Sequence, residues 1–356
     1  MIRGLGLLLS LFGLCAAQPA LAFDPDRLGR IAEAQDFNGV ILVSRGDTIV
    51  YLRAFGRVSP HDATPHRIDA QWRWASITKQ VIATIALQEV ASDRLSLGAP
   101  IARYWPDFPN ANRDRITIRH LLGHMSGLPD PEETPLLPTG LPSFYSEDGA
   151  EIAAADRYCA GPARAEPGAT YHYSNCDFIV LGALLERVTR TPLAELVRNR
   201  IPGARFIEDG TDALAGYHFG LPEPPIRFAA YGAAGGLQGT ILDLWRFDRA
   251  LMTGRLLGHD LSAAMWAGIP ANGYHALGQW VLPVRLAGCA KPVRLVERHG
   301  AIGGVQARNF IVPDTDIAVI AFTNRSEGEF AFGQVWRGEG FAHDLLAQAV
   351  CHWSEA

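Results

Sequence analysis

The sequence contains very little lysine. Of its 32 basic residues only Lys79 and Lys291 are lysines, and the other 30 are arginines. An arginine-heavy codon usage accounts for the excess. A guanidinium keeps its proton in proteins, whereas a buried lysine can lose it. Lys79 stands three residues after Ser76, a spacing that so few lysines rarely produce by chance, and this suggests a base beside a nucleophile.

Charge is also sparse. Charged residues make up 19% of the chain, the formal net charge is −5, and no basic block is interleaved with aromatic residues. This pattern argues against nucleic acid as a partner. A hydrophobic content of 48% is typical of a folded globular protein and excludes a disordered one.

No apolar run reaches the roughly 20 residues that a membrane-spanning helix needs. Residues 1–22 instead predict a secretory signal peptide. Arg3 is its charged start, Leu5 to Leu14 its apolar run, and Ala20-Leu21-Ala22 a small-x-small cleavage site before Phe23. The chain is therefore expected to be periplasmic or secreted, without a stable membrane anchor after cleavage.

Cysteine is scarce, and cleavage would remove Cys15. Four cysteines would remain, which allows three pairings of two disulfides. We favour Cys159 with Cys176 and Cys289 with Cys351, because these two pairs lie far apart in sequence. His172 lies between the first two cysteines, but no further ligand stands at a zinc-like spacing. A structural role is therefore expected, and no metal or other cofactor is predicted.

The order of patterns predicts an α+β fold. Residues 38–56 resemble a hairpin turning at Gly46-Asp47, and four further strands are expected after residue 276. Between them a buried helix should begin at Ser76, and Thr240 to Asp243 has the form of a capping box. We expect a single domain over 23–356, with one antiparallel sheet built from both ends of the chain (about 23–75 and 270–356) and flanked by helices, and a mostly helical insertion (about 76–269). The four late strands are expected at 277–286, 292–299, 305–312 and 317–323.

Ser76 and Lys79 would share one helix face and lie within hydrogen-bonding reach. A serine hydroxyl is a poor nucleophile until a base takes its proton, and a desolvated lysine is such a base. A helix start also offers unpaired N–H groups to an oxyanion. The simpler alternative is a capping serine beside a solvated lysine.

Two further stretches carry polar groups at junctions. Tyr173 and Asn175 lie where a loop meets an apolar helix, with helix capping as their simpler role. His299, Gly300 and Ala301 lie between two expected strands, where the glycines could serve a turn and the histidine the fold. The Pro-rich stretch 128–145 is long enough to suggest a functional surface loop.

Together and in this order, the three stretches resemble the motifs of the serine β-lactamase and penicillin-binding superfamily. Ser76-Ile77-Thr78-Lys79 is similar to the first motif and Tyr173-Ser174-Asn175 to the second, Tyr-x-Asn. His299-Gly300-Ala301 resembles the His-x-Gly form of the third, Lys-Thr-Gly in many members. The resemblance covers about residues 30–325, and its nearest branch holds class C β-lactamases, D-Ala-D-Ala carboxypeptidases, D-aminopeptidases and esterases.

The resemblance implies that Ser76 is acylated while Lys79 and Tyr173 share the general-base role. Asn175 would orient a substrate amide, and the N–H groups of Ser76 and of a residue near Ala301 would form the oxyanion hole. The third motif departs from the family: Ala301 stands where a glycine is usual, and the distance from His299 to Gly304 is about one residue short. His299 also titrates near neutrality and is no constant cation.

The function expected first is therefore an exported serine hydrolase, carboxypeptidase-like or esterase-like, acting on an ester or a D-amino-acid peptide. A β-lactamase is the second candidate. A catalytically idle protein that binds cell-wall peptides in the same pocket is the alternative from another class.

Overall fold

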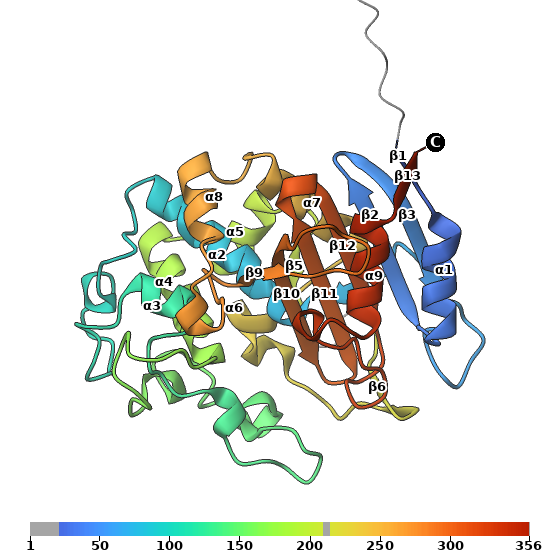
Figure 1. The fold of residues 1–356 in the computed structure, drawn as a ribbon. Helices are drawn as coiled ribbons and strands as arrows, with labels where there is room; N and C mark the ends of the chain where they lie inside the picture. Colours follow the sequence, from blue (N-terminus) through green and yellow to red (C-terminus); the bar gives the residue numbers. More distant parts are fainter. Residues whose placement is uncertain (1–20, 209–213, 356) are drawn as a thin grey trace, which may run out of the picture.

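The structure, a computed structural model, describes residues 21–208 and 214–355. Its centre is a six-stranded antiparallel sheet with the strand order β3-β2-β12-β11-β10-β9 (Figure 1). Two strands come from the early part of the chain and four from its late part, so the predicted α+β class and the sheet shared by both ends are confirmed. The strands are β2 (Gly39–Arg45), β3 (Thr48–Phe55), β9 (Trp280–Val284), β10 (Val293–Ile302), β11 (Val305–Val312) and β12 (Ile317–Thr323).

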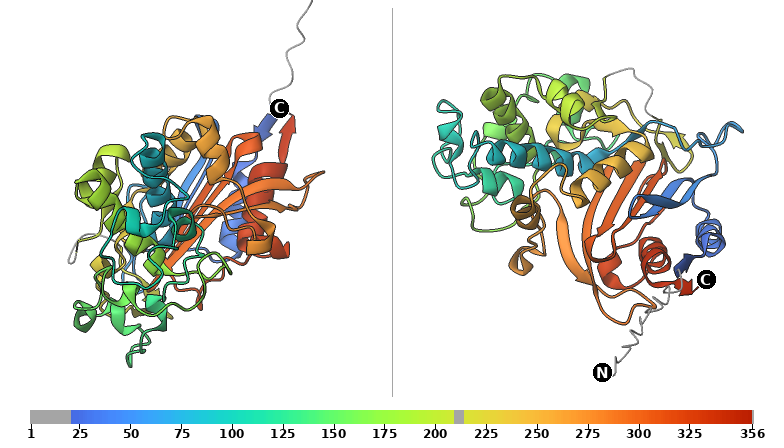
Figure 2. Two further views of the ribbon diagram at one scale, coloured as in Figure 1. Left: turned by 90° about the vertical axis from the view of Figure 1, so that its left-hand side faces the viewer. Right: turned by 90° about the horizontal axis from the view of Figure 1, so that it is seen from above.

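Different helices cover the two faces of this sheet (Figure 2). In β2, Val40 and Leu42 belong to the core shared with the middle helices, whereas Ile41 and Val43 belong to the core shared with the last helix. This alternation follows from the two-residue period of a strand. One face carries α1 (Pro25–Ala34) and α9 (Phe341–Cys351), and the other carries helices that include α2 (Thr78–Ala91), α4 (Asn175–Thr189), α5 (Leu193–Arg200) and α7 (Ile241–Met252).

Helix α2 runs through the larger core, and 11 of its 14 residues are buried. The predicted buried helix is thus confirmed, but it begins at Thr78 and not at Ser76. Ser76 lies in a 3₁₀ turn, Ala75–Ile77, directly before it. Ala75 has a φ of +46°, outside the right-handed helical region, so an α-helix could not begin before Ser76.

Some of the other predicted element bounds are confirmed, and the predicted end of one strand is wrong. Strands β11 and β12 have the predicted bounds, and the capping box of Thr240 and Asp243 opens α7. Strand β10 continues to Ile302, three residues beyond the prediction. The stretch His299 to Ala301 therefore lies inside a strand, where successive side chains face opposite sides of the sheet.

Smaller elements complete the fold. Strand β1 includes the predicted cleavage site after Ala22, and the rest of the predicted signal segment lies outside the described residues. None of the described helices is long and apolar enough to cross a membrane. The smaller elements are β1 (Leu21–Phe23) with β13 (Trp353–Glu355), the sheet of β4 (Trp72–Arg73), β8 (Leu237–Gly239) and β5 (Arg205–Phe206), the hairpin of β6 (Tyr217–His218) and β7 (Leu221–Pro222), and the helices α3 (Ile118–Leu122), α6 (Gly232–Gly235) and α8 (His259–Met265).

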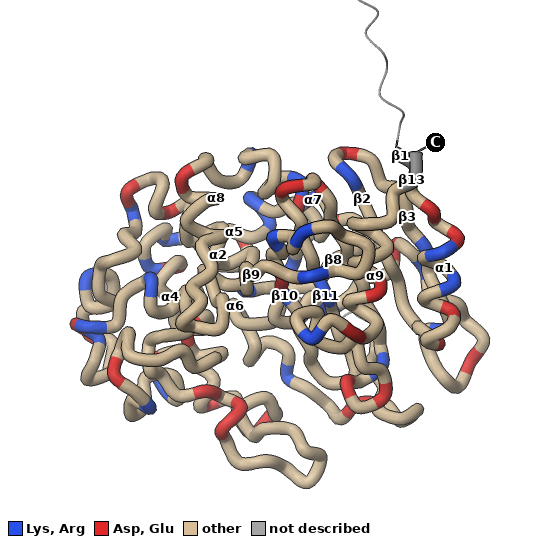
Figure 3. The backbone as a smooth tube through the Cα atoms, in the orientation of Figure 1, with Lys and Arg blue, Asp and Glu red and all other residues tan. Residues whose placement is uncertain are grey.

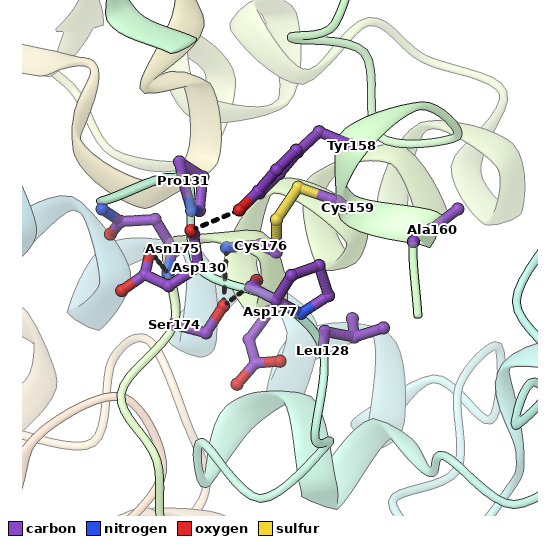
Figure 4. The surroundings of a disulfide bond; sticks show 12 residues. Leu128, Asp130, Pro131, Tyr158, Cys159, Ala160, Ser174, Asn175, Cys176 and Asp177 are labelled. Carbon is purple, nitrogen blue, oxygen red and sulfur yellow. Dashed lines mark hydrogen bonds between the residues drawn. A yellow bond between two sulfur atoms is a disulfide. The ribbon is translucent and has the colours of Figure 1, made fainter. Parts of the chain in front are cut away.

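Both predicted disulfides are present, Cys159 with Cys176 and Cys289 with Cys351. The first joins a 3₁₀ turn to the first turn of α4, beside Asp130 and Asn175 (Figure 4). It therefore ties the start of α4 to the loop region that packs on it.

Basic and acidic residues are interspersed along the backbone in the view of Figure 3.

Candidate active site

Ser76 and Lys79 meet at the start of α2. Lys79 Nζ lies 3.2 Å from Ser76 Oγ, as the one-turn spacing predicted. The left-handed backbone at Ala75 is uncommon for a residue with a Cβ, and such strained positions cluster at functional sites. The ammonium also donates to Asn175 Oδ1 at 2.6 Å and to the carbonyl of Ala234 at 2.7 Å, so its position is fixed by three oxygens.

Tyr173 reaches the same hydroxyl from the loop before α4. Its phenol oxygen lies 2.8 Å from Ser76 Oγ, and Lys79 Nζ lies 4.8 Å from the centre of its ring. Arg298 of β10 donates to the phenol oxygen at 2.9 Å and to the carbonyl of Ser76 at 2.8 Å. The serine hydroxyl thus contacts two groups that can take its proton, and a permanent cation lies against one of them.

These contacts change the acidity of both groups. Burial lowers the pKa of Lys79 to about 8, against the opposing attraction of Tyr173. Burial by itself raises the pKa of Tyr173, but the positive charges of Lys79 and Arg298 outweigh it, and the net pKa lies below the usual value. The two groups interact so closely that they titrate as a pair, and either can hold the proton taken from Ser76.

Asn175 is held by the Pro-rich stretch 128–145. Its Nδ2 donates to the hydroxyl of Tyr145 at 2.7 Å and lies 3.4 Å from Glu132 Oε1. Its backbone N–H donates to Asp130 Oδ1 at 3.1 Å. The sequence marked this stretch as a functional loop, but it gave no sign that Asp130, Glu132 and Tyr145 contact the second motif.

The third stretch lies one residue out of the expected register. Arg298, and not His299, faces Ser76 and Tyr173. His299 points to the opposite face of β10, where its Nδ1 lies 3.2 Å from Glu297 Oε1 and its ring stacks on Trp280 with centroids 4.9 Å apart. The expectation that His299 lies in the pocket of the nucleophile is therefore wrong, because a strand turns adjacent side chains to opposite sides.

Gly300 lies against the nucleophile. A Cβ added to it would lie 2.4 Å from the backbone nitrogen of Ser76, so only a glycine allows β10 to approach this turn. With Arg298 as the first residue of the third motif, Gly300 takes the position that the family fills with glycine. Counted from Arg298 instead of His299, the distance to Gly304 is one residue longer, which removes the one-residue shortfall. Ala301 then follows the motif and is exposed.

A buried pair of an acid and a histidine, Asp177 and His124, packs against Tyr173. The ring of His124 packs 4.5 Å from that of Tyr173, and His124 Nδ1 lies 3.1 Å from Asp177 Oδ2. The other carboxyl oxygen of Asp177 accepts a hydrogen bond from Ser126. Burial raises the pKa of Asp177 well above its usual value and lowers that of His124 well below, so both shifts favour the neutral forms of the two side chains. Sequence reasoning missed this pair.

A cleft of about 600 Å³ opens beside Asn175 and the end of β10. Glu132, which lies beside Asn175, and Ala301, which follows Gly300, line one side of it, and the β6–β7 hairpin lines the other. Ser76, Lys79 and Tyr173 are not part of its lining. Phe219, at the tip of that hairpin, is 73% exposed and has a φ of +49°. Two acids and one histidine are the side chains in its described lining that can carry a charge near neutral pH. The lining consists mainly of apolar residues, among them Leu141, Pro142, Phe219, Leu221, Pro222, Pro224, Ile226, Tyr231 and Ile302.

The model of the Beta-lactamase family matches residues 27–342, and the chain belongs to that family. The resemblance inferred from the three motifs is thereby confirmed. Among the described residues, no group of three or more His, Cys, Asp or Glu is placed to hold a metal ion.

Individual relatives are more distant. Esterase EstB of Burkholderia gladioli is 33% identical over 234 residues, which cover 60% of this chain and 58% of the relative. Penicillin-binding protein 4* of Bacillus subtilis is 24% identical over 209 residues, 57% and 43% of the two chains. The chain thus spans little more than half of the first and less than half of the second. The crystal structure of D-amino acid amidase from Ochrobactrum anthropi SV3 complexed with D-phenylalanine shares the fold, with a TM-score of 0.73 and 21% identity over 91% of this chain and 98% of that one.

Proposed function

We propose that the protein is a serine hydrolase that transfers an acyl group to Ser76 and then to water. One observation carries this proposal: Ser76 Oγ lies within hydrogen-bonding distance of both Tyr173 and Lys79, and Asn175 fixes the lysine. This arrangement supplies the activated nucleophile that acyl transfer needs.

In the proposed reaction, Ser76 Oγ bonds to the carbonyl carbon while its proton passes to the pair of Lys79 and Tyr173. The tetrahedral intermediate then breaks its bond to the alcohol or amine, which leaves with that proton. A water molecule attacks the acyl-enzyme, gives a proton to the same pair and releases the acid, and Ser76 regains its proton.

The oxyanion of each intermediate would accept hydrogen bonds from the backbone N–H groups of Ser76 and Ala301. The close approach of Gly300 to the Ser76 nitrogen supports this assignment, since it brings the end of β10 against the turn that carries the nucleophile. Asn175 would contact the acyl side of the substrate, because its side chain lies between Lys79 and Glu132.

The cleft supports an ester or amide whose acyl part is apolar and carries no negative charge. Its described lining holds Glu132, Glu327 and His218 but no lysine or arginine. Arg298 does not line the cleft and is only 1% exposed, and its Nε and Nη2 are bonded to Ser76 and Tyr173, which leaves Nη1 as its one nitrogen without a partner among the described residues. We therefore rank an esterase-like activity first, with a carboxypeptidase-like one beside it, and a β-lactamase second.

We also propose that the chain is exported. The signal-like residues 1–22 and the two disulfides support an oxidising compartment, the periplasm or the outside of the cell. Alkylation of the native protein without reduction should label none of the four cysteines, and two or more labelled thiols would contradict it.

The enzymatic proposal is tested with p-nitrophenyl esters, a D-alanyl-D-alanine peptide and a chromogenic cephalosporin, with intact-mass measurement of the protein. We expect an acyl adduct or turnover that Ser76→Ala abolishes and the exposed control Ser96→Ala retains. If wild type and Ser76→Ala behave alike on every acyl donor, the assignment fails. Adducts that form without turnover on any donor would favour the idle binding protein.

A further inference from the structure

A second cavity lies behind strand β10, on the face of the sheet that points away from Ser76. Its volume is about 200 Å³, and it opens to solvent between the end of β12 and the start of α9. Polar side chains of β10 and β11 line its floor, and two aromatic side chains line its wall. The lining includes Glu297, His299, Arg308, Glu327 and Trp336.

Glu297 is the unusual member of this lining. The residue is only 3% exposed. One of its carboxyl oxygens, Oε1, accepts a hydrogen bond from His299 Nδ1 at 3.2 Å. The other, Oε2, has no hydrogen-bond partner in the described part of the chain. Buried carboxylate oxygens are almost always paired, since an unpaired one is costly, so this atom calls for a donor.

The charges around the cavity leave one negative charge unbalanced. Arg308 lies 3.7 Å from Glu327, and the charge of Glu297 acts on it more strongly than that of Glu327, so one guanidinium faces two carboxylates. Burial lowers the pKa of His299, with Glu297 opposing the effect, and the imidazole is neutral near pH 7. The lining thus holds two carboxylates and one permanent cation, which leaves one negative charge in excess in a cavity where the low dielectric strengthens charge interactions.

We propose that this cavity binds a small organic cation, a protonated primary amine, whose ammonium group donates to Glu297 Oε2. Trp336 at the rim is 48% exposed and offers an apolar surface for the alkyl part of the amine. The site is independent of the proposed acyl transfer, because neither Ser76 nor any residue of its proton network lines it.

The position of the cavity relative to the candidate active site follows from the strand. Glu297 and His299 face the cavity, whereas Arg298 and Gly300, which alternate with them, face Ser76 and Tyr173. The bound cation would therefore contact the face of β10 opposite to the one that packs against Ser76.

Calorimetric titration of the full chain with n-butylammonium chloride tests the proposal. Sodium butyrate, n-butanol and potassium chloride at equal ionic strength serve as anionic, neutral and inorganic controls. We expect saturable binding of one butylammonium per chain and none of the controls. Glu297→Gln should weaken it about tenfold or more, because the charge is lost while an oxygen remains for His299. Trp336→Ala, which changes only the rim, should weaken it by a smaller factor.

Two matched variants locate the site. Glu33→Gln removes an exposed acid elsewhere, and Glu132→Gln removes the acid that lines the cleft beside Asn175 but not the second cavity; both should leave the affinity unchanged. The proposal is overturned if butylammonium does not bind, if the controls bind equally well, if Glu297→Gln binds like wild type, or if Glu132→Gln alone abolishes binding. None of these results bears on whether Ser76 is acylated, which the ester assay decides separately.

Discussion

The guanidinium of Arg298 donates a hydrogen bond of 2.9 Å from Nη2 to the phenol oxygen of Tyr173, and its Nε donates to the carbonyl of Ser76. A strand of the sheet thus places a permanent positive charge beside the phenol that contacts the nucleophile. Arginine keeps this charge at every pH at which the protein is folded, which His299 could not. The cation that many family members supply with a lysine therefore has an arginine in its place.

Arg298→Gln should shift the pH dependence of acyl transfer. Arg298 lowers the pKa values of Tyr173 and Lys79, so its removal raises both, and the network keeps its protons to higher pH. The ascending limb of kcat/KM should therefore move to more alkaline pH, with a loss of about tenfold to a hundredfold at neutral pH from the missing charged hydrogen bond. Arg298→Lys keeps the charge and should keep the limb near its original place. A pH–rate profile on a p-nitrophenyl ester measures both.

His299→Gln is the companion to these variants. Its side chain faces the rear of the sheet and can still donate to Glu297, so the pH limb should stay where it is in wild type. If the ascending limb moves in His299→Gln but not in Arg298→Gln, then His299, and not Arg298, is the residue of the third motif that acts on the nucleophile.

Much of the fold follows from local pattern. Strand β12 is a run of apolar and β-branched residues, whereas β11 also contains Gln306, Arg308 and Asn309. Both strands are buried along their whole length, and their bounds were predicted correctly. Ser76 and Lys79 were paired correctly because their spacing within one helical turn is a local property. The start of α2 was predicted two residues too early, because Ser76 and Ile77 belong to a 3₁₀ turn that packs against β10, a contact between distant parts of the chain.

The site residues that sequence reasoning missed depend on tertiary structure. Whether Arg298 or His299 faces the serine is decided by the register of β10 against β11, and a shift of one residue reverses every side chain. Asp130, Glu132 and Tyr145 come from a Pro-rich stretch without periodicity, so no pattern places them at Asn175. The pair of His124 and Asp177 joins residues 53 positions apart.

Lys79→Met should reveal the cost of burying the ammonium. Burial lowers the pKa of Lys79 to about 8 from 10.5, so between these values the unfolded chain binds more protons than the folded one. The unfolding free energy of wild type therefore rises with pH across this window, whereas that of the variant lacks this rise. We expect the difference in unfolding free energy, Lys79→Met minus wild type, to fall from pH 8 to 10.5. Urea denaturation at several pH values measures it, and a flat or rising difference would contradict the lowered pKa.

Asp177→Asn should be far less damaging than Asp177→Ala. Burial raises the pKa of Asp177, so the folded protein holds a neutral acid that an amide imitates in shape and hydrogen bonding. Alanine leaves the partners of that acid unpaired, His124 and Ser126, at a cost of about 1–3 kcal/mol. Chemical denaturation near pH 7 compares the two variants. An asparagine as costly as the alanine would show that the carboxyl is ionised.

Phe219→Ala should reduce the preference for long acyl chains. The ring lines the cleft at the tip of the β6–β7 hairpin, and its exposure without a ligand is what a substrate wall requires. Loss of part of its apolar contact, roughly 1.4 kcal/mol, should lower kcat/KM for a decanoate ester about tenfold and leave the acetate ester unchanged. Ile269→Ala, which removes an exposed apolar side chain outside the cleft, should change neither. If Phe219→Ala lowers the two rates equally, the hairpin acts on the reaction itself and not on the acyl chain.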